Sequence, residues 1–357
     1  MRRVLVERLE TEAVLAQDLV DANGVTLLRR GQPISPRLAD RLRRVGIAEI
    51  LVMDPLLADL DLQPPLNPDT ISTVTARLNE IMTGARKAFQ DGHPYTVAGD
   101  MLQPLARMIV DDLSANRHRK FEMIPVVNPD YLLGHLLNVA VLAVQLGRRS
   151  NLPYDRLVDL AAGGLVLDLG MLGQADVIRR APRPLEPGEW SIIHQHPAQG
   201  VAWLGESVSA YTKAIVARHH ERLDGSGYPE GTAGDQLHPM VRIAMVADVY
   251  VALTSDRPHR RRIPAHEAID YIMSMSGIHF DPRVTRNLLS VVHPYPLGVR
   301  VRLGSGRVGV VVGDRGMGTR PIVRVFQEGT RRVDPPYEVD LSAPEFQTEF
   351  ITEILYS

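Results

Sequence analysis

Cysteine is absent from this chain of 357 residues, which excludes disulfides, iron–sulfur clusters, thiolate zinc sites and a cysteine nucleophile. Any bound metal must therefore use histidine, carboxylate or water as ligands. An excess of one charge is also lacking, because 40 Lys and Arg face 42 Asp and Glu and leave a net charge of −2. Proteins that bind long nucleic acids concentrate Lys and Arg, so we do not expect DNA binding.

Long uninterrupted apolar runs are missing as well. The most apolar stretches, around 132–146 and 157–172, contain polar residues that include His135 and Asp168, whereas a membrane span needs about 20 apolar residues without charge. The first eight residues, MRRVLVER, lack the apolar core of a signal peptide. We therefore expect a cytoplasmic protein without a membrane partner.

Residues 1–54 have the pattern of a small α/β module. Short apolar runs typical of strands stand at 25–28 and 50–52, and an amphipathic stretch passes through Leu38 and Leu42 between them. The following segment, 55–68, contains four prolines, which can continue neither a helix nor a central strand. We interpret this segment as a linker.

Helical periodicity dominates the middle of the chain. In the segment 69–120, apolar residues at three- and four-residue steps predict amphipathic helices over 71–89 and 101–113. These two helices could pair across a homodimer, although packing on their own domain is the default. From 121 to 297 the pattern stays helical in blocks separated by breaks rich in proline and glycine. A largely α-helical domain is therefore predicted here.

The pattern changes again near residue 298. Apolar residues alternate with polar ones and are separated by glycine-rich turns over 298–341, which predicts a small β-meander. The tail, 342–357, carries enough apolar residues to dock as a short helix. The predicted fold is mainly α: a helical domain flanked by a small N-terminal α/β module and a small C-terminal β-meander.

Charged residues interrupt the apolar helices at positions that suggest a ligand role. Asp168 lies in the run GGLVLDLGM, and burial of an ionised carboxylate is costly unless a cation or several donors accompany it. We favour a ligand role for Asp168, with an exposed residue at a helix end near Gly170 as the alternative. A lone histidine such as His135 is more often a packed, hydrogen-bonded residue than a metal ligand.

The stretch 218–229 reads RHHERLDGSGYP. Adjacent helical residues point about 100° apart, so His219 and His220 reach one centre only near a helix end or in a wide metal cluster. Gly225 and Gly227 permit left-handed backbone, whose N–H groups can bind an anion, and Tyr228 could stack on a nucleobase. Taken alone, a solvated histidine pair before an ordinary turn explains the pattern equally well.

Taken together, these motifs resemble the signature of the HD-GYP family, metal-dependent phosphodiesterases that act on cyclic di-GMP. The segment 189–200, EWSIIHQHPAQG, resembles the family's Glu…His-Pro-x-x-Gly element, which points to His196 and leaves His194 outside the ligand set. The segment 242–258 is similar to the family's Arg-Ile…Val-Ala-Asp…Ala-Leu-Thr…Arg-Pro element. The similarity covers roughly 120–297, about half of the chain.

The resemblance implies a metal centre and a substrate loop. The implied metal ligands are His135, Asp168, His196, His219, His220 and Asp248. Four imidazoles and two carboxylates suit one or two Fe, Mn or Zn ions rather than Ca or Mg alone. The catalytic role implied for Asp168 is to bridge two ions and a metal-bound hydroxide. Gly227 and Tyr228 would belong to the substrate loop, and Arg257 and Arg260 would face the phosphates, because guanidinium groups pair bidentately with phosphate oxygens.

Three positions depart together from the family pattern. Leu167 replaces the histidine of the family's His-Asp pair, Met171 replaces a lysine, and Tyr131 replaces an acidic ligand that some members carry. A two-metal site activates a water and clamps both the attacking and the leaving oxygen, so a weakened second ion removes most of that action. Loss of one charge-stabilising group typically costs ~10²–10³ in rate.

We therefore predict an HD-GYP-type protein that binds metal and cyclic di-GMP, or a related cyclic dinucleotide, with weak or lost hydrolysis. One alternative is an active metal-dependent cyclic di-GMP phosphodiesterase. Another is a non-catalytic scaffold that docks a diguanylate cyclase through its Gly-Tyr-Pro loop. A generic nucleotide phosphohydrolase is disfavoured, because the Gly-Tyr-Pro loop would then be unexplained.

Overall fold

The structure is a computed structural model that describes residues 2–355, apart from 10, 11, 46, 48, 61, 62, 129, 175–180, 182, 184, 258, 259, 316 and 317. The chain folds into two compact units. Unit 1 contains Met1–Val20, Thr26–Gln63 and Val292–Ser357, and unit 2 contains Asp21–Val25 and Pro64–Val291. Unit 1 thus joins the N-terminal and C-terminal regions, which the sequence pattern treats as separate modules.

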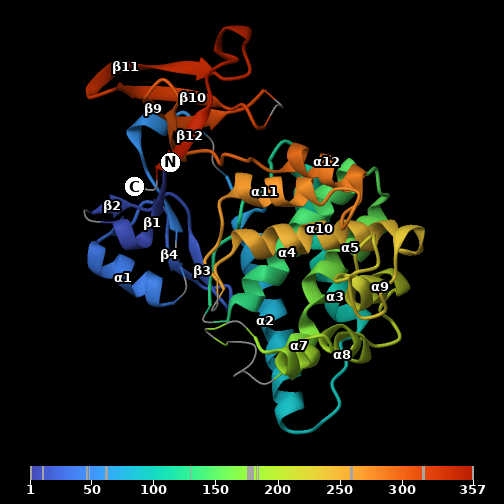
Figure 1. Ribbon diagram of the computed structural model, residues 1–357. Coiled ribbons are helices and arrows are strands. Elements are labelled where there is room, and N and C mark those ends of the chain that lie inside the picture. Colours follow the sequence, from blue (N-terminus) through green and yellow to red (C-terminus); the bar gives the residue numbers. More distant parts are fainter. Residues whose placement is uncertain are drawn as a thin grey trace. The chain divides into compact units, whose positions relative to one another are not determined.

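The N-terminal part of unit 1 consists of short strands and one helix (Figure 1). Its strand pairs are antiparallel: β1 (Arg2–Leu5) with β6 (Glu49–Val52), β2 (Ala13–Val14) with β5 (Pro33–Ile34), and β3 (Leu19–Asp21) with β4 (Thr26–Leu28). Helix α1 (Pro36–Arg44) begins at Ser35, whose hydroxyl accepts a hydrogen bond from the Leu38 N–H at 3.3 Å. The predicted strands near 25–28 and 50–52 and the helix between them are confirmed.

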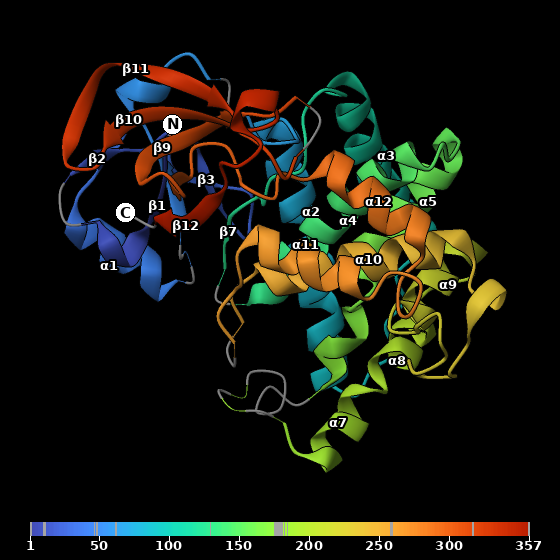
Figure 2. The ribbon, with the colours of Figure 1, turned by 45° about the horizontal axis from the view of Figure 1, so that its top comes forward.

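The C-terminal part of unit 1 is a five-stranded antiparallel sheet in the order β11-β10-β9-β8-β12 (Figure 2). Its strands are β8 (Arg300–Leu303), β9 (Arg307–Gly313), β10 (Ile322–Glu328), β11 (Arg331–Asp340) and β12 (Ile351–Leu355). The predicted β-meander over 298–341 is confirmed. The predicted helix in the tail is wrong, because the tail forms the short 3-10 turn η5 (Pro344–Phe346) and then strand β12.

Strand β12 forms because it completes the edge of the sheet. It pairs with β8, so that Ile354 lies opposite Val301. Ile351 and Ile354 pack against the buried core of the sheet, to which Val301 belongs. The local spacing of apolar residues does not reveal a partner about fifty residues earlier in the chain, so helical and extended conformations could not be told apart.

The segment predicted as a linker is anchored within unit 1. After β6 the chain forms the 3-10 turn η2 (Pro55–Leu57), and Leu57 packs with Val310 and Val312 at 1% exposure. Next to it, both oxygens of Asp59 accept hydrogen bonds from Arg324 at 2.7 Å. This part of the segment is therefore held against the five-stranded sheet.

Unit 2 is an assembly of helices. In chain order its elements are α2 (Pro68–Gln90), α3 (Gly99–Ala115), β7 (Val126–Val127), α4 (Tyr131–Arg149), α5 (Tyr154–Val166), η3 (Leu169–Gly173), α7 (Pro187–Ile193), α8 (His196–Ala202), α9 (Ala210–Arg218), η4 (Gly234–Gln236), α10 (Pro239–Thr254), α11 (Ala265–Ser274) and α12 (Pro282–Val291). The helices predicted over 71–89 and 101–113 are α2 and α3. The mainly α fold class is confirmed.

Helix α4 forms the centre of this unit. In both ribbon views it runs beside α5 and α10, and the packing contacts agree (Figures 1 and 2). By length and composition α4 could cross a membrane, but 83% of its apolar window is buried inside the unit. It is therefore a core helix, and its polar residue His135 is 3% exposed. A buried imidazole at this depth needs polar partners.

Candidate metal centre

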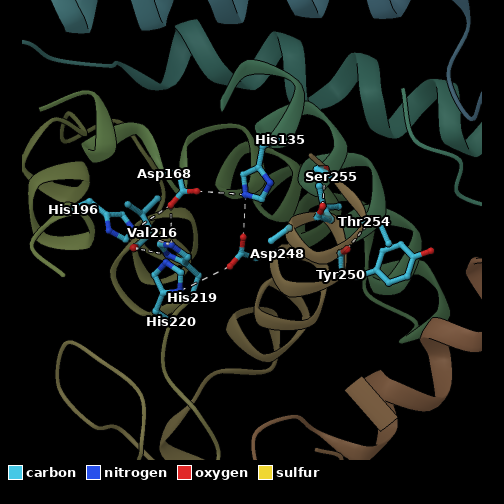
Figure 3. Close-up of polar contacts among 12 residues, drawn as sticks. His135, Asp168, His196, Val216, His219, His220, Asp248, Tyr250, Thr254 and Ser255 are labelled. Atoms are coloured by element: carbon cyan, nitrogen blue, oxygen red, sulfur yellow. Dashed lines mark hydrogen bonds and ion pairs between the residues drawn. The ribbon is translucent and has the colours of Figure 1, made fainter. Parts of the chain in front are cut away.

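Six polar side chains from five parts of unit 2 converge on one place (Figure 3). They are His135 on α4, Asp168 between α5 and η3, His196 at the start of α8, His219 and His220 just after α9, and Asp248 on α10. All are buried except His220, which is partly exposed. The structure thus brings together every residue that the sequence suggested as a metal ligand.

The first of two ligand groups contains Asp168, His196, His219 and His220. One Asp168 oxygen, Oδ1, lies 3.1 Å from His196 Nε2 and 3.4 Å from His219 Nε2. The two Nε2 atoms are 3.2 Å apart. Atoms that coordinate one ion at about 2.1 Å lie roughly 3.0–3.4 Å from each other, so this spacing fits a shared divalent cation.

Backbone carbonyls orient two of these imidazoles. His196 Nδ1 lies 2.7 Å from the Ile193 carbonyl oxygen, and His219 Nδ1 lies 3.0 Å from that of Val216. Since a carbonyl only accepts, each Nδ1 donates its proton, and the lone pair of each neutral ring is left on Nε2. Two lone pairs and a carboxylate oxygen then face one another, an arrangement that a cation or an added proton must stabilise.

The second ligand group contains His135, Asp168 and Asp248. His135 Nε2 lies 3.0 Å from Asp248 Oδ1 and 3.4 Å from Asp168 Oδ2. His135 Nδ1 is buried and has no hydrogen-bond partner in the described part of the chain. Asp168 therefore directs one oxygen to each group and is the only residue that both groups share.

The charges of the centre shift several pKa values. Burial alone would raise the pKa of Asp168, but hydrogen bonds with His135, His196 and His219 outweigh it and hold that pKa well below its usual range. Burial alone would lower the pKa values of His135 and His219, but their carboxylate partners raise both. His220 differs, because burial and then the charge of His219 hold its pKa well below the usual value. A cation could displace the protons on His135 and His219 and keep both carboxylates compensated.

The three positions that depart from the HD-GYP pattern lie around this centre. Leu167 ends α5 with no exposed surface, and Met171 in η3 is 9% exposed. Tyr131 begins α4, and the Arg257 guanidinium lies over its ring, 5.4 Å from the ring centroid. Neither Leu167 nor Met171 can carry charge or transfer a proton, so the second group offers three ligands where the first offers four.

Gly170 permits the close approach that brings Asp168 to His196. A Cβ atom at this position would collide with the carbonyl oxygen of His196 and the backbone nitrogen of Gly200. η3 and α8 therefore touch through their backbones, and any side chain larger than hydrogen would push them apart. From the sequence pattern Gly170 was expected only to lie near a helix end, so this role was not predicted.

Glu221 organises the loop after the paired histidines, a role that was not predicted from the sequence. It is fully buried, and its two carboxylate oxygens accept the backbone N–H groups of Glu230 at 2.9 Å and Thr232 at 3.0 Å. The N–H groups of Glu230 and Thr232 are therefore satisfied inside the protein. The sequence signal for this role was the position of Glu221, which directly follows a histidine pair and precedes a glycine-rich turn.

The two glycines of this loop have different functions. Gly225 has a φ of +79° and thus adopts the left-handed backbone that both glycines permit. Gly227 does not have a positive φ. A Cβ at Gly227 would instead collide with the backbone of Glu221 and Arg222. Gly227 is thus required for close packing of the loop on itself.

Tyr228 lies between two imidazole rings. The His194 ring stacks on it with centroids 3.8 Å apart, and the His220 ring stacks at 4.6 Å. Burial, together with the negative charges of Asp168 and Asp248, raises the pKa of the Tyr228 hydroxyl, so the ring is neutral. Both faces are covered, and a nucleobase could stack on Tyr228 only after His194 moves. His194, which the sequence left outside the ligand set, therefore covers the loop tyrosine.

The arginines suggested as phosphate contacts occupy one short turn. Backbone hydrogen bonds in both directions join Arg257 and Arg260, at 2.9 and 3.1 Å. The Arg260 guanidinium donates to the Ala252 carbonyl oxygen, whereas Arg257 Nε is buried and has no hydrogen-bond partner among the described residues. The charge of Arg257 lowers the pKa of His135, although less than the carboxylates raise it, so Arg257 acts on the centre electrostatically.

The fold and the centre agree with a family comparison. The model of the HD domain family matches residues 100–284, which is more than half of the chain. The chain therefore belongs to the HD domain family, and its motifs and named relatives place it in the HD-GYP branch. The cluster of His and Asp at its centre supports binding of a divalent metal.

Curated relatives of this chain are phosphodiesterases. A cyclic di-GMP phosphodiesterase of Pseudomonas aeruginosa is 36% identical over 239 residues, which cover 65% of this chain and 58% of that protein. A 3′3′-cGAMP-specific phosphodiesterase of Vibrio cholerae is 31% identical over 46% of this chain and 36% of its own length. The chain thus matches at most about 58% of the length of either relative.

One solved structure is also similar. It is that of an HDG"Y"P protein from Bdellovibrio bacteriovorus, which is 14% identical to this chain. The superposition covers 80% of this chain and 97% of that protein, with a TM-score of 0.48.

Proposed function

We propose that this chain binds one or two transition-metal ions and a cyclic dinucleotide, with weak or lost phosphodiesterase activity. The observation that carries the proposal is the position of Asp168, whose two oxygens face two ligand groups, one with four members and one with three. The four-ligand group holds three imidazoles, a set that suits Fe, Mn or Zn. The three-ligand group lacks the imidazole whose place Leu167 takes.

The proposed ligand follows from the names of the relatives and from the charges near the centre. The two relatives described above act, by name, on cyclic di-GMP and on 3′3′-cGAMP, both cyclic dinucleotides. Arg257 Nε is buried beside the centre and has no hydrogen-bond partner within the described part of the chain, and this group could donate to a phosphate oxygen. Displacement of His194 would expose one face of Tyr228 to a base.

The chain's own residues would bind, orient and compensate charge. A bound divalent ion would activate water and withdraw charge from the phosphoryl group. His196 and His219 would hold such an ion with rings that backbone carbonyls have already oriented. Arg257 would attract the negatively charged phosphodiester toward the centre. Met171 supplies neither charge nor proton to the leaving group, and this is the physical reason to expect slow turnover.

Metal content and hydrolysis, measured on one anaerobic preparation, test this proposal. We expect at least one transition-metal ion per chain, binding of cyclic di-GMP, and slow release of linear product. The double variant Leu167→His with Met171→Lys reverses two of the three departures from the family pattern, so it should raise turnover by roughly 10²–10³. A protein with neither transition metal nor affinity for a cyclic dinucleotide would refute the proposal.

An active phosphodiesterase is the second candidate, and the complete four-ligand group favours it. In that case the native chain should turn over cyclic di-GMP rapidly, and the double variant should change the rate by less than about threefold. The scaffold alternative predicts instead that Asp168→Ala and His220→Ala leave the binding of a diguanylate cyclase unchanged. These measurements separate the three functions.

A further inference from the structure

A cavity of about 710 Å³ opens in unit 2, away from the metal centre. Its walls come from the segment after α3, from the last turn of α4 and from the start of α5, with Ser290 and Val291 of α12. Arg148 lines the cavity and lies thirteen residues after His135 on α4, which is about 20 Å along a helix. The cavity and the metal centre are thus separate sites at opposite ends of one helix.

The cavity concentrates positive charge in a chain whose overall charge is −2. Five of its lining side chains are cationic: Arg117, Arg119, Lys120, Arg148 and Arg149. No Asp or Glu is among the described residues that line it. Elsewhere in unit 2, arginines such as Arg156 and Arg242 form ion pairs with carboxylates. The like charges of Arg117, Arg148 and Arg149 repel one another, and an anionic ligand would relieve this repulsion.

The arrangement is more than a basic helix end. Cations at the last turn of α4 are favourable on their own, because they interact with the negative end of the helix dipole. That explains Arg148 and Arg149, but Arg117, Arg119 and Lys120 follow a different helix. Burial, and then the charges of Arg117 and Arg149, lower the pKa of Arg148. The two segments therefore bring their charges close enough to interact.

Two buried polar atoms beside the cavity lack partners. Gln145 is 5% exposed, and its Oε1 has no hydrogen bond in the described part of the chain, although its Nε2 donates to the Arg119 carbonyl oxygen at 3.2 Å. Arg119 Nε is likewise buried and unpartnered among the described residues. A buried polar atom without a hydrogen bond destabilises the folded protein. A bound molecule with donors and acceptors could satisfy both.

Apolar and aromatic residues form another part of the cavity wall, beside the polar residues Ser114, His118, Asn151 and Ser290. They are Leu152, Tyr154, Leu157 and Val291. The Tyr154 ring is 41% exposed, and its hydroxyl is fixed by a 2.8 Å hydrogen bond to Asp111. A held, partly exposed ring offers a stacking surface for a planar group. Pockets of roughly 300–1,000 Å³ are typical of small-molecule sites, and this cavity falls within that range.

We propose that this cavity binds a small molecule that carries adjacent phosphates and a planar group, of the class of nucleoside diphosphates and triphosphates. The arginines bind the phosphates, Tyr154 stacks on the base, and Gln145 satisfies a polar edge. The same phosphate chemistry occurs in inorganic pyrophosphate, which lacks the base. The proposal does not depend on the function of the metal centre.

Calorimetric titration of the full chain with GDP, pyrophosphate and inorganic phosphate tests the site. We expect the double variant Arg117→Glu with Arg149→Glu to weaken GDP binding by at least about 100-fold, because it replaces two charge-assisted hydrogen bonds to the phosphates with repulsion between like charges. Both side chains are exposed, so the fold should survive. The matched control, Arg77→Glu with Lys87→Glu on exposed positions of α2, makes the same change in net charge and should alter affinity by less than about threefold.

Two further variants locate the ligand and its base. Tyr154→Ala should weaken GDP about tenfold and leave pyrophosphate unchanged, because only GDP has a base to stack. Asp168→Ala, at the metal centre, should leave GDP binding intact. Equal affinity for GDP and pyrophosphate would support the phosphate site and identify a pyrophosphate-type ligand. The proposal is overturned if no probe binds, if the arginine variant binds like the native chain, or if Asp168→Ala abolishes binding.

Discussion

The two ligand groups of the metal centre share Asp168 but differ in chemistry. The first adds three imidazoles to the shared carboxylate, and the second adds one imidazole and one carboxylate. Nitrogen-rich sites favour Fe or Zn, whereas oxygen-rich sites favour Mn or Mg. One replacement, Leu167, thus changes more than the number of ligands. If the residues bind metal as proposed, it would leave two neighbouring sites with different metal preferences, of which the first should fill at lower metal concentration.

Asp168→Ala should have the largest effect, because it removes a ligand from both groups. Four-ligand zinc sites bind with about 10–16 kcal/mol, so one ligand corresponds to roughly 3 kcal/mol, or about 100-fold in affinity. We therefore expect about 100-fold weaker binding at each group, measured by competition with a chelator. Asp155→Ala, at an exposed position on α5, is the control. Retention of native metal affinity would show that Asp168 does not bridge the groups.

A pair of single variants should separate the groups. His219→Ala removes an imidazole from the first group and should weaken the tighter ion about 100-fold, by the same accounting. His135→Ala affects only the second group, so the tighter ion should stay and only the weaker one should be lost. Elemental analysis at increasing metal concentration distinguishes the two. If both variants lose the same ion, the comparison between the groups fails.

Acid should weaken metal binding. Burial alone lowers the pKa values of His135 and His219, but their carboxylate partners raise both above 6.5. In the metal-free protein, protonation of His135 and His219 stabilises the fold. This contribution is complete below the pKa of the unfolded state and is lost as the pH rises through the raised pKa of the folded state. A metal must displace these protons, so affinity should fall from about pH 8 to about pH 6, by up to about tenfold per unit for each proton.

Proton release during metal titration, measured in buffers of different ionisation enthalpy, checks this pH dependence. We expect release near neutral pH in the native chain and less release in His135→Ala. Affinity that is equal at both ends of the pH range would mean that the two histidines are already neutral without metal.

Leu167→His tests the difference between the two ligand groups by adding a ligand instead of removing one, and it should have the smallest effect on metal affinity. A restored imidazole would give the second group a fourth ligand and should raise its metal affinity at least about tenfold. The gain is smaller than that of a complete ligand, because the buried site must repack around the new ring. The readout is the number of ions per chain at a fixed metal concentration. Leu169→His places the same ring at a neighbouring buried position and should not raise the metal content.

The sequence predicted the parts of this molecule that depend on local patterns. Apolar periodicity identified α2 and α3, and alternation identified the meander. Motif resemblance selected six side chains that the structure brings together, although their role as ligands is still a prediction. Strand β12 was not predicted, because its partner, β8, lies far away in sequence and pairing at that distance leaves no local pattern.

The contacts within the loop and the cavity could not be predicted from the sequence for a related reason. Glu221 bonds to N–H groups nine and eleven residues later, and His194 covers Tyr228 from another helical segment. Such contacts depend on the three-dimensional path of the backbone. The basic cavity likewise combines Arg117 with Arg149, which are separated by a complete helix. Single-sequence patterns cannot reveal which charged segments face each other.

The absence of a side chain at Gly170 sets the spacing of the candidate metal centre. A single methyl group there would act as a wedge between η3 and α8, although every candidate ligand would be retained. Gly170→Ala would therefore alter the spacing of the ligands without altering their chemistry. Selectivity among ions of different radius, for a metal bound at this place, would then depend on the absence of a side chain at Gly170.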